Sequence, residues 1–389
     1  MIEIEIDITG IAHCGKSVGR YNGKVVFIPY GIPGERVKAQ IVKDKGDYYR
    51  AEIKDIIEPS LFREKPPCKL FGKCGGCSFQ HVAYSYQTKL KEIVTIEQLK
   101  RIGGFENAED LTKPTISAEK PYNYRNKADF SLNKDKLLGF KIRGTHKFLH
   151  VDYCHIMEEK INEILSMLHG KSPKRKTHNI TIRYGVRTKT YLVQPEIDTD
   201  EIKTGQPYYT EILLQKEFQI SAPSFFQVNT YQTEKLIQKI LNYITDDDKT
   251  VVDTYAGVGT FTVFLAEKAE KVIAIEESRS ACKNAQVNIK GYDNIIIYLC
   301  DKAEKAILKP GINGDAIVID PPRVGCSKEV LDGIVKKKIK KIIYISCEPS
   351  TLARDLKYLK ERGYKLVELQ PIDMFPQTYH IENLALMIL

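Results

Sequence analysis

The chain has 389 residues, 42% of them hydrophobic, and this length allows two or three domains, one of which can bury a complete α/β core. No stretch approaches about 18 apolar residues, and the N-terminus lacks a basic region followed by an apolar run; both features argue against a membrane span or secretory signal and for a cytoplasmic protein. The net charge is +9, and residues 61–220 carry most of the surplus, which is typical either of a polyanion-binding surface or of a solvated lysine-rich face.

Residues 2–58 are predicted to form a small antiparallel barrel. Short alternating runs such as IEIEIDI and KVVFIPY are separated by glycine and proline turns. Such barrels often bind single-stranded nucleic acid through aromatic and basic side chains. The residues with this character are Arg20, Tyr21, Tyr48, Tyr49 and Arg50, although the tyrosines could equally pack or decorate the barrel. Cys14 is expected to be a packing residue.

The next segment carries a cysteine motif. Cys68, Cys74 and Cys77 have the spacing C-x5-C-x2-C, and Gly75 and Gly76 allow the backbone to fold around a bound group. The chain has nine cysteines, an odd number, and no secretory signal, so a disulfide framework is not expected. Three thiolates on one loop therefore predict a metal centre that needs one further ligand.

The fourth ligand is predicted to be Cys154, the next cysteine along the chain, with His155 and His81 as less favoured substitutes. Zinc sites usually take their ligands as two close pairs. Three ligands plus one suit a cubane iron–sulfur cluster better. Spacing alone leaves the identity of the metal open.

An amphipathic helix is predicted between Val82 and Gly104, where two glycines end the helical pattern. Beyond it, residues 115–220 alternate strand-like runs, among them KADFSLN and NITIRYG, with one helix near Glu158–Leu168. This pattern predicts an antiparallel sheet that carries the basic surplus.

The last part of the chain has the alternating strands and helices of a doubly wound sheet. One apolar run ends at Tyr255, a turn follows at Gly257 and Gly259, and a helical pattern leads to a second apolar run that ends at Glu276. Glycines let the backbone approach a ligand, and Glu276 stands where a carboxylate accepts ribose hydroxyls. A dinucleotide would call for a third glycine, which is missing, so S-adenosylmethionine is favoured over a dinucleotide.

Three other residues stand at or just beyond predicted strand ends: Asp320 in DPPRVG, Cys347 in YISCEPSTLARD and Glu382 in FPQTYHIE. Each has a structural explanation, since the aspartate could cap a turn, the cysteine could belong to the core and the glutamate could be a surface charge. Asp320 and Cys347 fall at the edge where a doubly wound sheet binds its ligands, and this favours chemistry. Asp320 also begins a motif like that of amino-group methyltransferases, but Arg323 stands where those enzymes have an aromatic residue.

A thiolate beside a methyl donor suits methylation at carbon 5 of a pyrimidine. That carbon is a poor nucleophile, so a cysteine adds to carbon 6, and a base later removes the proton from carbon 5. Arg323 or a helix N-terminus near Thr351 would lower the pKa of the thiol. An RNA cytosine methyltransferase would use the same thiol chemistry, and the alternative of another class is a non-catalytic RNA-binding iron–sulfur protein.

Five motifs, CxxxxxCGGC, SFFQVN, DPPRxG, SCxPxTLARD and FPxTxHxE, together resemble the RNA uracil-C5 methyltransferases that have an N-terminal TRAM barrel and a [4Fe-4S] cluster. The resemblance covers essentially the whole chain. It implies that Cys347 is the nucleophile and Glu382 the proton acceptor. The implied cluster ligands are Cys68, Cys74, Cys77 and Cys154. The implied contacts to S-adenosylmethionine are Gln227, Tyr255, Glu276 and Asp320, with Asp301 as a weaker addition.

The resemblance implies an α/β protein with three domains. These are a TRAM β-barrel at 1–60, a central antiparallel β domain with the cluster loop at 61–220, and a Rossmann-like seven-stranded methyltransferase domain at 221–389. The helix at 82–104 is expected to pack on the last of these. The domain set resembles the bacterial 23S rRNA enzymes more than the bacterial tRNA enzymes, so we expect 5-methyluridine in 23S rRNA, with tRNA as the alternative and without an obligate protein partner.

Two positions depart from the family pattern. Ala256 stands where the family often has cysteine, which should matter little because its backbone would face the cofactor. Glu348 replaces the usual asparagine after the nucleophile. A carboxylate pointing at Cys347 would raise the pKa of the thiol, so Glu348 is predicted to face away.

Overall fold

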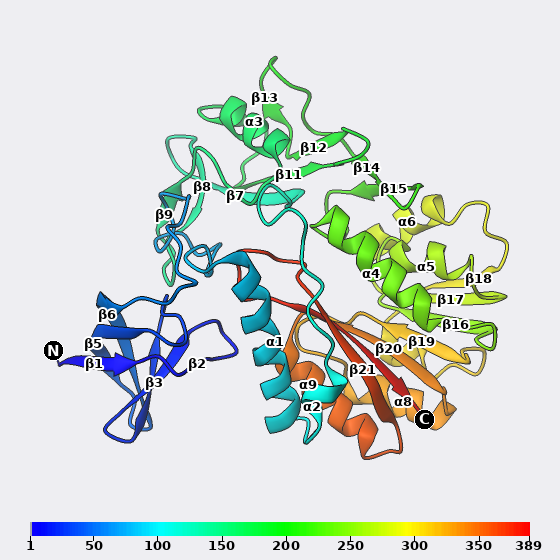
Figure 1. Ribbon diagram of the computed structural model, residues 1–389. Helices are drawn as coiled ribbons and strands as arrows, with labels where there is room; N and C mark the ends of the chain where they lie inside the picture. Colours follow the sequence, from blue (N-terminus) through cyan, green and yellow to red (C-terminus); the bar gives the residue numbers. More distant parts are fainter. Residues whose placement is uncertain (1) are drawn as a thin grey trace.

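A computed structural model describes residues 2–389, and for 296–299 the backbone alone. Figure 1 shows an N-terminal sheet, a helix α1 that crosses to the C-terminal part, a central β region and a large C-terminal α/β sheet. Within the described residues, none of the helices combines the length and the hydropathy of a membrane-crossing segment.

The N-terminal part is a six-stranded sheet with the order β1-β5-β6-β4-β3-β2. Its strands are β1 Glu3–Asp7, β2 Gly10–Ile11, β3 Ser17–Tyr21, β4 Lys24–Ile28, β5 Arg36–Asp44 and β6 Tyr48–Glu58. Alternate residues of β1 and β4, such as Ile4, Ile6 and Val26, are buried on one face. Cys14 is exposed rather than packed, because it lies in the turn between β2 and β3.

The sheet is mixed, not purely antiparallel as predicted, because β4 pairs with β6 in parallel. The long strand β6 explains this difference. It forms a hairpin with β5 whose register shifts at three places. Such irregularities bend a strand, and the first residues of β6, Tyr48–Arg50, pair with Val25–Phe27 of β4 along the edge of β6 that faces away from β5.

The central region contains an antiparallel sheet with the order β12-β11-β7-β8-β9. Its strands are β7 Lys127–Leu132, β8 Leu138–Lys141, β9 Phe148–His150, β11 Asn179–Tyr184 and β12 Tyr191–Gln194. Helix α3, Glu159–Leu168, packs Ile161, Ile164 and Leu165 in a core with Ile180 and Ile182 of β11. The short strands β10 Ser172–Pro173 and β13 Ile197–Asp198 and the hairpin β14 Tyr208–Leu213 with β15 Lys216–Ser221 complete this region.

The C-terminal sheet has the order β18-β17-β16-β19-β20-β22-β21. These strands are, in that order, Ile295–Cys300, Lys271–Glu276, Thr250–Thr254, Ala316–Ile319, Lys341–Ser346, Glu382–Ile388 and Lys365–Ile372. The first five run parallel, and β22 is antiparallel to both of its neighbours. The predicted α/β class is therefore confirmed, and five carboxyl ends meet at one edge of the sheet.

Helices cover both faces of this sheet. They are α4 Thr230–Tyr243, α5 Thr260–Leu265, α6 Arg279–Asn288, α7 Ala303–Ala306, α8 Lys328–Lys337 and α9 Pro349–Lys360. One apolar core holds α4, α5 and α6, and the other holds α7, α8 and α9. Helix α1, Tyr84–Arg101, and the short α2, Ala108–Leu111, pack with the second group, where Leu99 and Ala108 share a core with Leu356 of α9 (Figure 1).

Candidate active site

A single cavity of about 1660 Å³ follows the carboxyl edge of the C-terminal sheet and continues to the cysteine loop. All eleven residues for which the sequence predicts a role line this cavity. They are Cys347 and Glu382; Gln227, Tyr255, Glu276, Asp301 and Asp320; and Cys68, Cys74, Cys77 and Cys154. The tertiary structure thus brings together side chains that are up to 314 positions apart in the chain.

The parallel strands explain how the C-terminal members of this set meet. Tyr255, Asp301, Asp320 and Cys347 each follow the last residue of a parallel strand, and Glu276 is itself such a last residue. Glu382 comes from an antiparallel strand but begins it at the same edge, because Asn383 pairs with Ser346 of β20.

The glycine turn after β16 has the backbone conformation that its sequence predicts. Gly257 and Gly259 have φ angles of 60° and 86°, which are strained for residues with a side chain. The Glu276 carboxylate accepts hydrogen bonds from the Gly257 N–H at 2.8 Å and from the Ser278 N–H at 2.7 Å. These bonds fix the carboxylate beside the turn. A Cβ on Gly257 would meet no other atom within 4 Å, so the space beside this glycine is open.

Gln227 is buried in the loop between β15 and α4. Two elements hold this loop. Arg183 of the central sheet donates from Nη2 to the carbonyl oxygens of Ala222 and Ser224, at 3.2 and 2.6 Å. Asn284 of α6 accepts from the Ser224 hydroxyl at 2.8 Å. Sequence reasoning missed both residues, because neither belongs to a recognisable motif.

Cys347 is half-buried at the end of β20. Burial raises the pKa of the thiol to about 12, and the Glu382 carboxylate acts in the same direction. The Arg323 guanidinium, which also hydrogen-bonds the sulfur, lowers this pKa. Arg323 acts in the predicted direction, but the pKa of the thiol is raised and not lowered overall, because burial is the larger effect.

Two carboxyl groups lie near this thiol. Glu382 is 4% exposed, and burial together with the nearby Asp320 raises the pKa of its carboxyl well above the usual range, while Arg323 opposes this. Burial and the neighbouring Asp253 raise the pKa of Asp320 to about 7. Arg323 therefore lies near the Cys347 thiol and the Glu382 carboxyl, and burial favours the neutral form of both groups in the free protein.

Helix α9 holds the loop that carries Arg323. The Thr351 hydroxyl donates to the Arg323 carbonyl oxygen at 3.1 Å, and Arg354 Nη2 donates to the Val324 carbonyl oxygen at 2.9 Å. The buried Asp355 accepts from the Cys326 N–H at 2.9 Å. These three residues belong to the TLARD part of a predicted motif, but the sequence did not predict that they hold this loop.

Glu348 is turned toward the N-terminal sheet. Its Oε1 lies 2.7 Å from His13 Nε2 and accepts from the Ser350 hydroxyl at 2.8 Å. The side chain thus pairs with residues other than Cys347, in line with the expectation that it faces away. Gly15 packs closely in the same region, since a Cβ there would lie 2.4 Å from Tyr379 Cβ.

The four cysteines of the predicted metal centre lie on two loops at the other end of the cavity. Burial, together with neighbouring thiols of the same group, raises the pKa of Cys77 to about 12 and that of Cys154 to about 11. Burial also raises the pKa of Cys74. Of the two substitutes, His155 lines the cavity, whereas His81 is buried against Tyr30 and Phe71.

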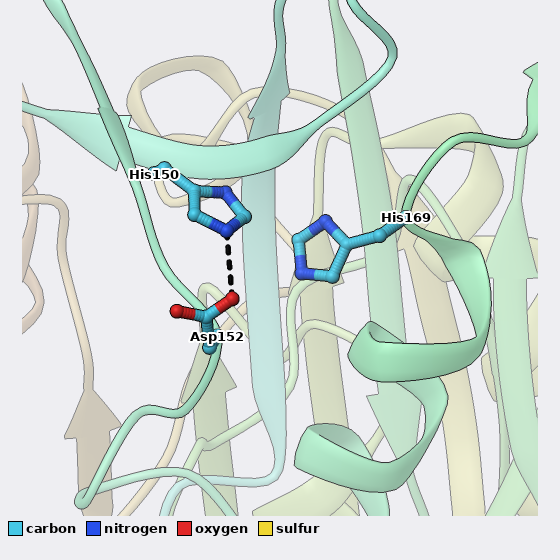
Figure 2. Close-up of side chains that lie close together, drawn as sticks. All are labelled: His150, Asp152 and His169. Carbon is cyan, nitrogen blue, oxygen red and sulfur yellow. Dashed lines mark hydrogen bonds and ion pairs between the residues drawn. The ribbon is translucent and has the colours of Figure 1, made fainter.

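A tighter group of possible ligands, His150, Asp152 and His169, lies on the central region (Figure 2). His150 Nε2 is 2.7 Å from Asp152 Oδ1, and the Leu138 N–H donates to His169 Nδ1 at 3.2 Å. Because that Nδ1 accepts a hydrogen bond, the neutral ring carries its proton on Nε2 and has no lone pair there for a metal. The group therefore fits a structural role, in which its hydrogen bonds hold the first residue of β8.

Comparisons with known proteins agree with this architecture. The family model described as tRNA (Uracil-5-)-methyltransferase matches residues 213–304 and 305–388, and the TRAM domain model matches residues 3–54. An uncharacterized RNA methyltransferase of Clostridium tetani is 33% identical, over 98% of this chain and 95% of its own length. Another from Caldanaerobacter subterraneus is 35% identical, over 98% and 97%.

One solved structure shares the whole fold. The tRNA (uracil-54, C5)-methyltransferase of Pyrococcus abyssi, in complex with S-adenosyl-L-homocysteine, superposes with a TM-score of 0.75 and covers 98% of this chain and 99% of its own. Its sequence is 22% identical, so the likeness concerns the fold.

Proposed function

This chain belongs to the TRAM-containing RNA uracil-C5 methyltransferase family and methylates uracil carbon 5 in RNA with S-adenosylmethionine, and we propose that Cys347 and Glu382 carry out this reaction on 23S rRNA. The observation that carries the assignment of residues is the single cavity in which a thiol, an arginine and a buried carboxyl lie beside the glycine turn. This arrangement supports a covalent mechanism on a uracil that is turned out of the RNA.

The Cys347 thiol gives up its proton to solvent, and the thiolate sulfur forms a bond to carbon 6 of the uracil while the electrons of the 5,6 double bond shift to give an enolate, with its negative charge on the oxygen at carbon 4. Carbon 5 then forms a bond to the methyl group of S-adenosylmethionine as the bond between that methyl group and the sulfonium sulfur breaks. The remainder of the cofactor leaves as S-adenosylhomocysteine. Glu382 takes the remaining proton from carbon 5, the double bond re-forms, and the sulfur leaves as a thiolate. Glu382 has to be ionised for this last proton transfer; Arg323 favours the ionised carboxylate, and the raised pKa makes that carboxylate a stronger base.

Arg323 supports the first step. Burial holds Cys347 as a neutral thiol in the free protein, and a guanidinium beside the sulfur stabilises the thiolate as it forms. Asp320 lies close enough to affect both Cys347 and Glu382, which suits a residue that contacts the uracil or the methyl donor.

The cofactor contacts follow from the edge of the C-terminal sheet. Glu276 would accept the ribose hydroxyls, with Tyr255, Gln227 and Asp320 around the remainder of the molecule. Asp301 is the weaker member, because it already pairs with Lys309 at 2.8 Å.

The four cysteines fit a [4Fe-4S] cluster by their chemistry. Buried thiols that raise one another's pKa are stabilised as thiolates only when a cation lies among them. Within the described chain the four thiols do not form a group whose sulfur atoms all lie within 4.8 Å of one another, so the donor set, and not a preformed geometry, supports the proposed cluster. Cys68, Cys74, Cys77 and Cys154 would hold the cluster, whose contribution we take to be structural.

The choice of RNA rests on the domain set. A TRAM barrel with the cysteine motif resembles the 23S rRNA enzymes, but the Pyrococcus abyssi protein of the same fold has a tRNA substrate. Transfer RNA is therefore the second candidate. Mapping 5-methyluridine in both RNAs from cells with and without this gene decides between them, since the affected RNA loses its methyl group.

RNA that contains 5-fluorouridine tests the mechanism. Fluorine at carbon 5 blocks the final elimination, so the protein should remain covalently bound to the RNA in the presence of S-adenosylmethionine. Cys347→Ala should abolish this adduct, and Cys14→Ala, at an exposed cysteine that does not line the cavity, should retain it. An adduct that persists in Cys347→Ala, or none in the parent protein, contradicts the proposed mechanism.

A further inference from the structure

We propose that Gln87, Lys91 and Thr95, here called the α1 stripe, act as positioning residues for Glu382, an inference that rests on the proton-acceptor role proposed above. The three residues are spaced by four along α1 and therefore share one face of the helix. Each is 1% exposed. The helix thus buries a polar face against the C-terminal part, where its sequence predicted a simple amphipathic pattern.

Lys91 is a buried cation with defined partners. Its Nζ lies 2.5 Å from Asp373 Oδ1 and donates to the Phe375 carbonyl oxygen at 3.0 Å. The Tyr84 hydroxyl donates to the other Asp373 oxygen at 2.9 Å. Lysine is almost never fully buried unless it is paired. The contact therefore fixes the first residues of the segment 373–381, which connects β21 with Glu382.

The rest of the stripe holds the same segment farther along. Gln87 and Gln377 exchange two hydrogen bonds of 3.0 Å, one between their side chains and one from the Gln377 N–H to Gln87 Oε1. The Thr95 hydroxyl donates to Asn383 Oδ1 at 3.2 Å. Asn383 follows Glu382 directly and pairs with Ser346, which precedes Cys347. The α1 stripe thus holds the chain on both sides of Glu382, the proposed base.

The stripe acts on one step of the reaction more than on the others. Arg323, which stabilises the thiolate, is held by α9 and not by α1. Glu382 acts only after methyl transfer, when the sulfur is already bonded to carbon 6. A displaced Glu382 therefore leaves the methylated RNA bound to Cys347, whereas a general loss of structure slows bond formation as well.

The test compares the rates of adduct formation and adduct release on uridine-containing RNA with S-adenosylmethionine. The variant Lys91→Met/Asp373→Asn removes both buried charges, so that neither is left unpaired. We expect adduct formation to stay within about twofold of the parent and release to slow by about 100-fold, the scale of a 1 Å misplacement. A covalent protein–RNA species should then accumulate.

Three other variants make the result unambiguous. Glu382→Gln should accumulate the same adduct, and if it does not, the proposed function fails and not the inference. Lys89→Met removes an exposed lysine of the same helix and should behave as the parent. Thr95→Val loses only the hydroxyl that donates to Asn383, and the release of the adduct should slow several-fold. This variant tests the inference if the double variant does not fold.

The inference is overturned if adduct formation and release slow by the same factor, because that outcome indicates a structural role only. It is also overturned if release keeps the parental rate in the folded variants, while Glu382→Gln accumulates the adduct.

Discussion

At the scale of single residues, the balance of charge around Cys347 is the main chemical feature. Burial and Glu382 favour the neutral thiol, and Arg323 is the cation that opposes them. In such surroundings the thiol of the proposed nucleophile is mostly protonated at neutral pH in the free protein. This would protect the thiol from oxidation, since reactivity follows the thiolate.

The pH dependence of adduct formation should reflect the raised pKa of Cys347. Below the pKa the thiolate fraction rises tenfold per pH unit, so the rate of adduct formation with 5-fluorouridine RNA should keep rising from neutral pH to well above about 8.5, the ordinary thiol value. A profile that levels off near that ordinary value would show that burial does not control the thiol.

Replacing Arg323 by glutamine should raise the pKa of Cys347 further and lower the rate of adduct formation near neutral pH by about tenfold, which corresponds to one pKa unit. Lys365→Gln serves as the control and should leave the rate unchanged. Lys365 is exposed and is the first residue of β21. Equal rates in the two variants would contradict the role of Arg323.

Glu276 should matter for binding rather than for the chemical step. Glu276→Ala removes the acceptor for the Gly257 and Ser278 N–H groups and the proposed ribose contact, each worth about 1 kcal/mol or more. Calorimetry should show a dissociation constant for S-adenosylmethionine raised by at least about tenfold. Glu270→Gln, at an exposed position before β17, should bind as the parent does.

At the scale of elements, α9 links the nucleophile to the cation that stabilises it. The helix begins two residues after Cys347, and Thr351, Arg354 and Asp355 on its first turns hold the loop 321–326. One short helix therefore sets the distance between sulfur and guanidinium. The motif TLARD is explained by this contact and not by direct chemistry.

Asp355→Asn tests this explanation. Asp355 is 1% exposed and accepts from the Tyr344 hydroxyl at 2.6 Å as well as from the Cys326 N–H. Loss of the charge should reduce the free energy of unfolding by about 1–3 kcal/mol and slow adduct formation. Urea denaturation and the 5-fluorouridine assay measure the two effects. Asp247→Asn, at an exposed position between α4 and β16, is the matched control.

At the scale of the whole molecule, the site is assembled from all three parts of the chain. The cavity runs from the cysteine loop to the glycine turn, α1 leaves the N-terminal half to pack on the C-terminal sheet, and His13 of the N-terminal sheet pairs with Glu348 beside the nucleophile. The C-terminal α/β part alone therefore lacks the side chains of α1 that hold the segment 373–381 and the histidine that pairs with Glu348.

The cysteine centre should be needed for the integrity of this assembly. Cys74→Ser is expected to lower the iron and sulfide content of the purified protein and to weaken folding or RNA binding, because a cluster loses one thiolate ligand. Cys14→Ser, at an exposed cysteine, should retain both. Chemical iron analysis, thermal unfolding and RNA binding measure the result. Normal stability and RNA affinity together with abolished single-turnover chemistry would contradict a structural role.

Much of this organisation can be predicted from the sequence, because strand and helix periodicity and the glycine turn are local signals. The α/β class, the helix α1, the central antiparallel strands and the residues at the strand ends follow from such patterns. The purely antiparallel N-terminal barrel was wrong, since the bends of β6 that allow its parallel pairing with β4 depend on contacts along the whole sheet.

The sequence by itself determined which atoms are available for chemistry: a thiol, a carboxylate and a cation in three separate motifs, and four further cysteines, three of them in one motif. Only the tertiary structure decided which of them share one cavity, how far burial shifts the pKa of Cys347, and that Lys91 and Asp373 neutralise each other across 282 positions. The physical reason is that burial and pairing depend on distance in space, and no local pattern encodes the distance between segments that fold together from opposite ends of the chain.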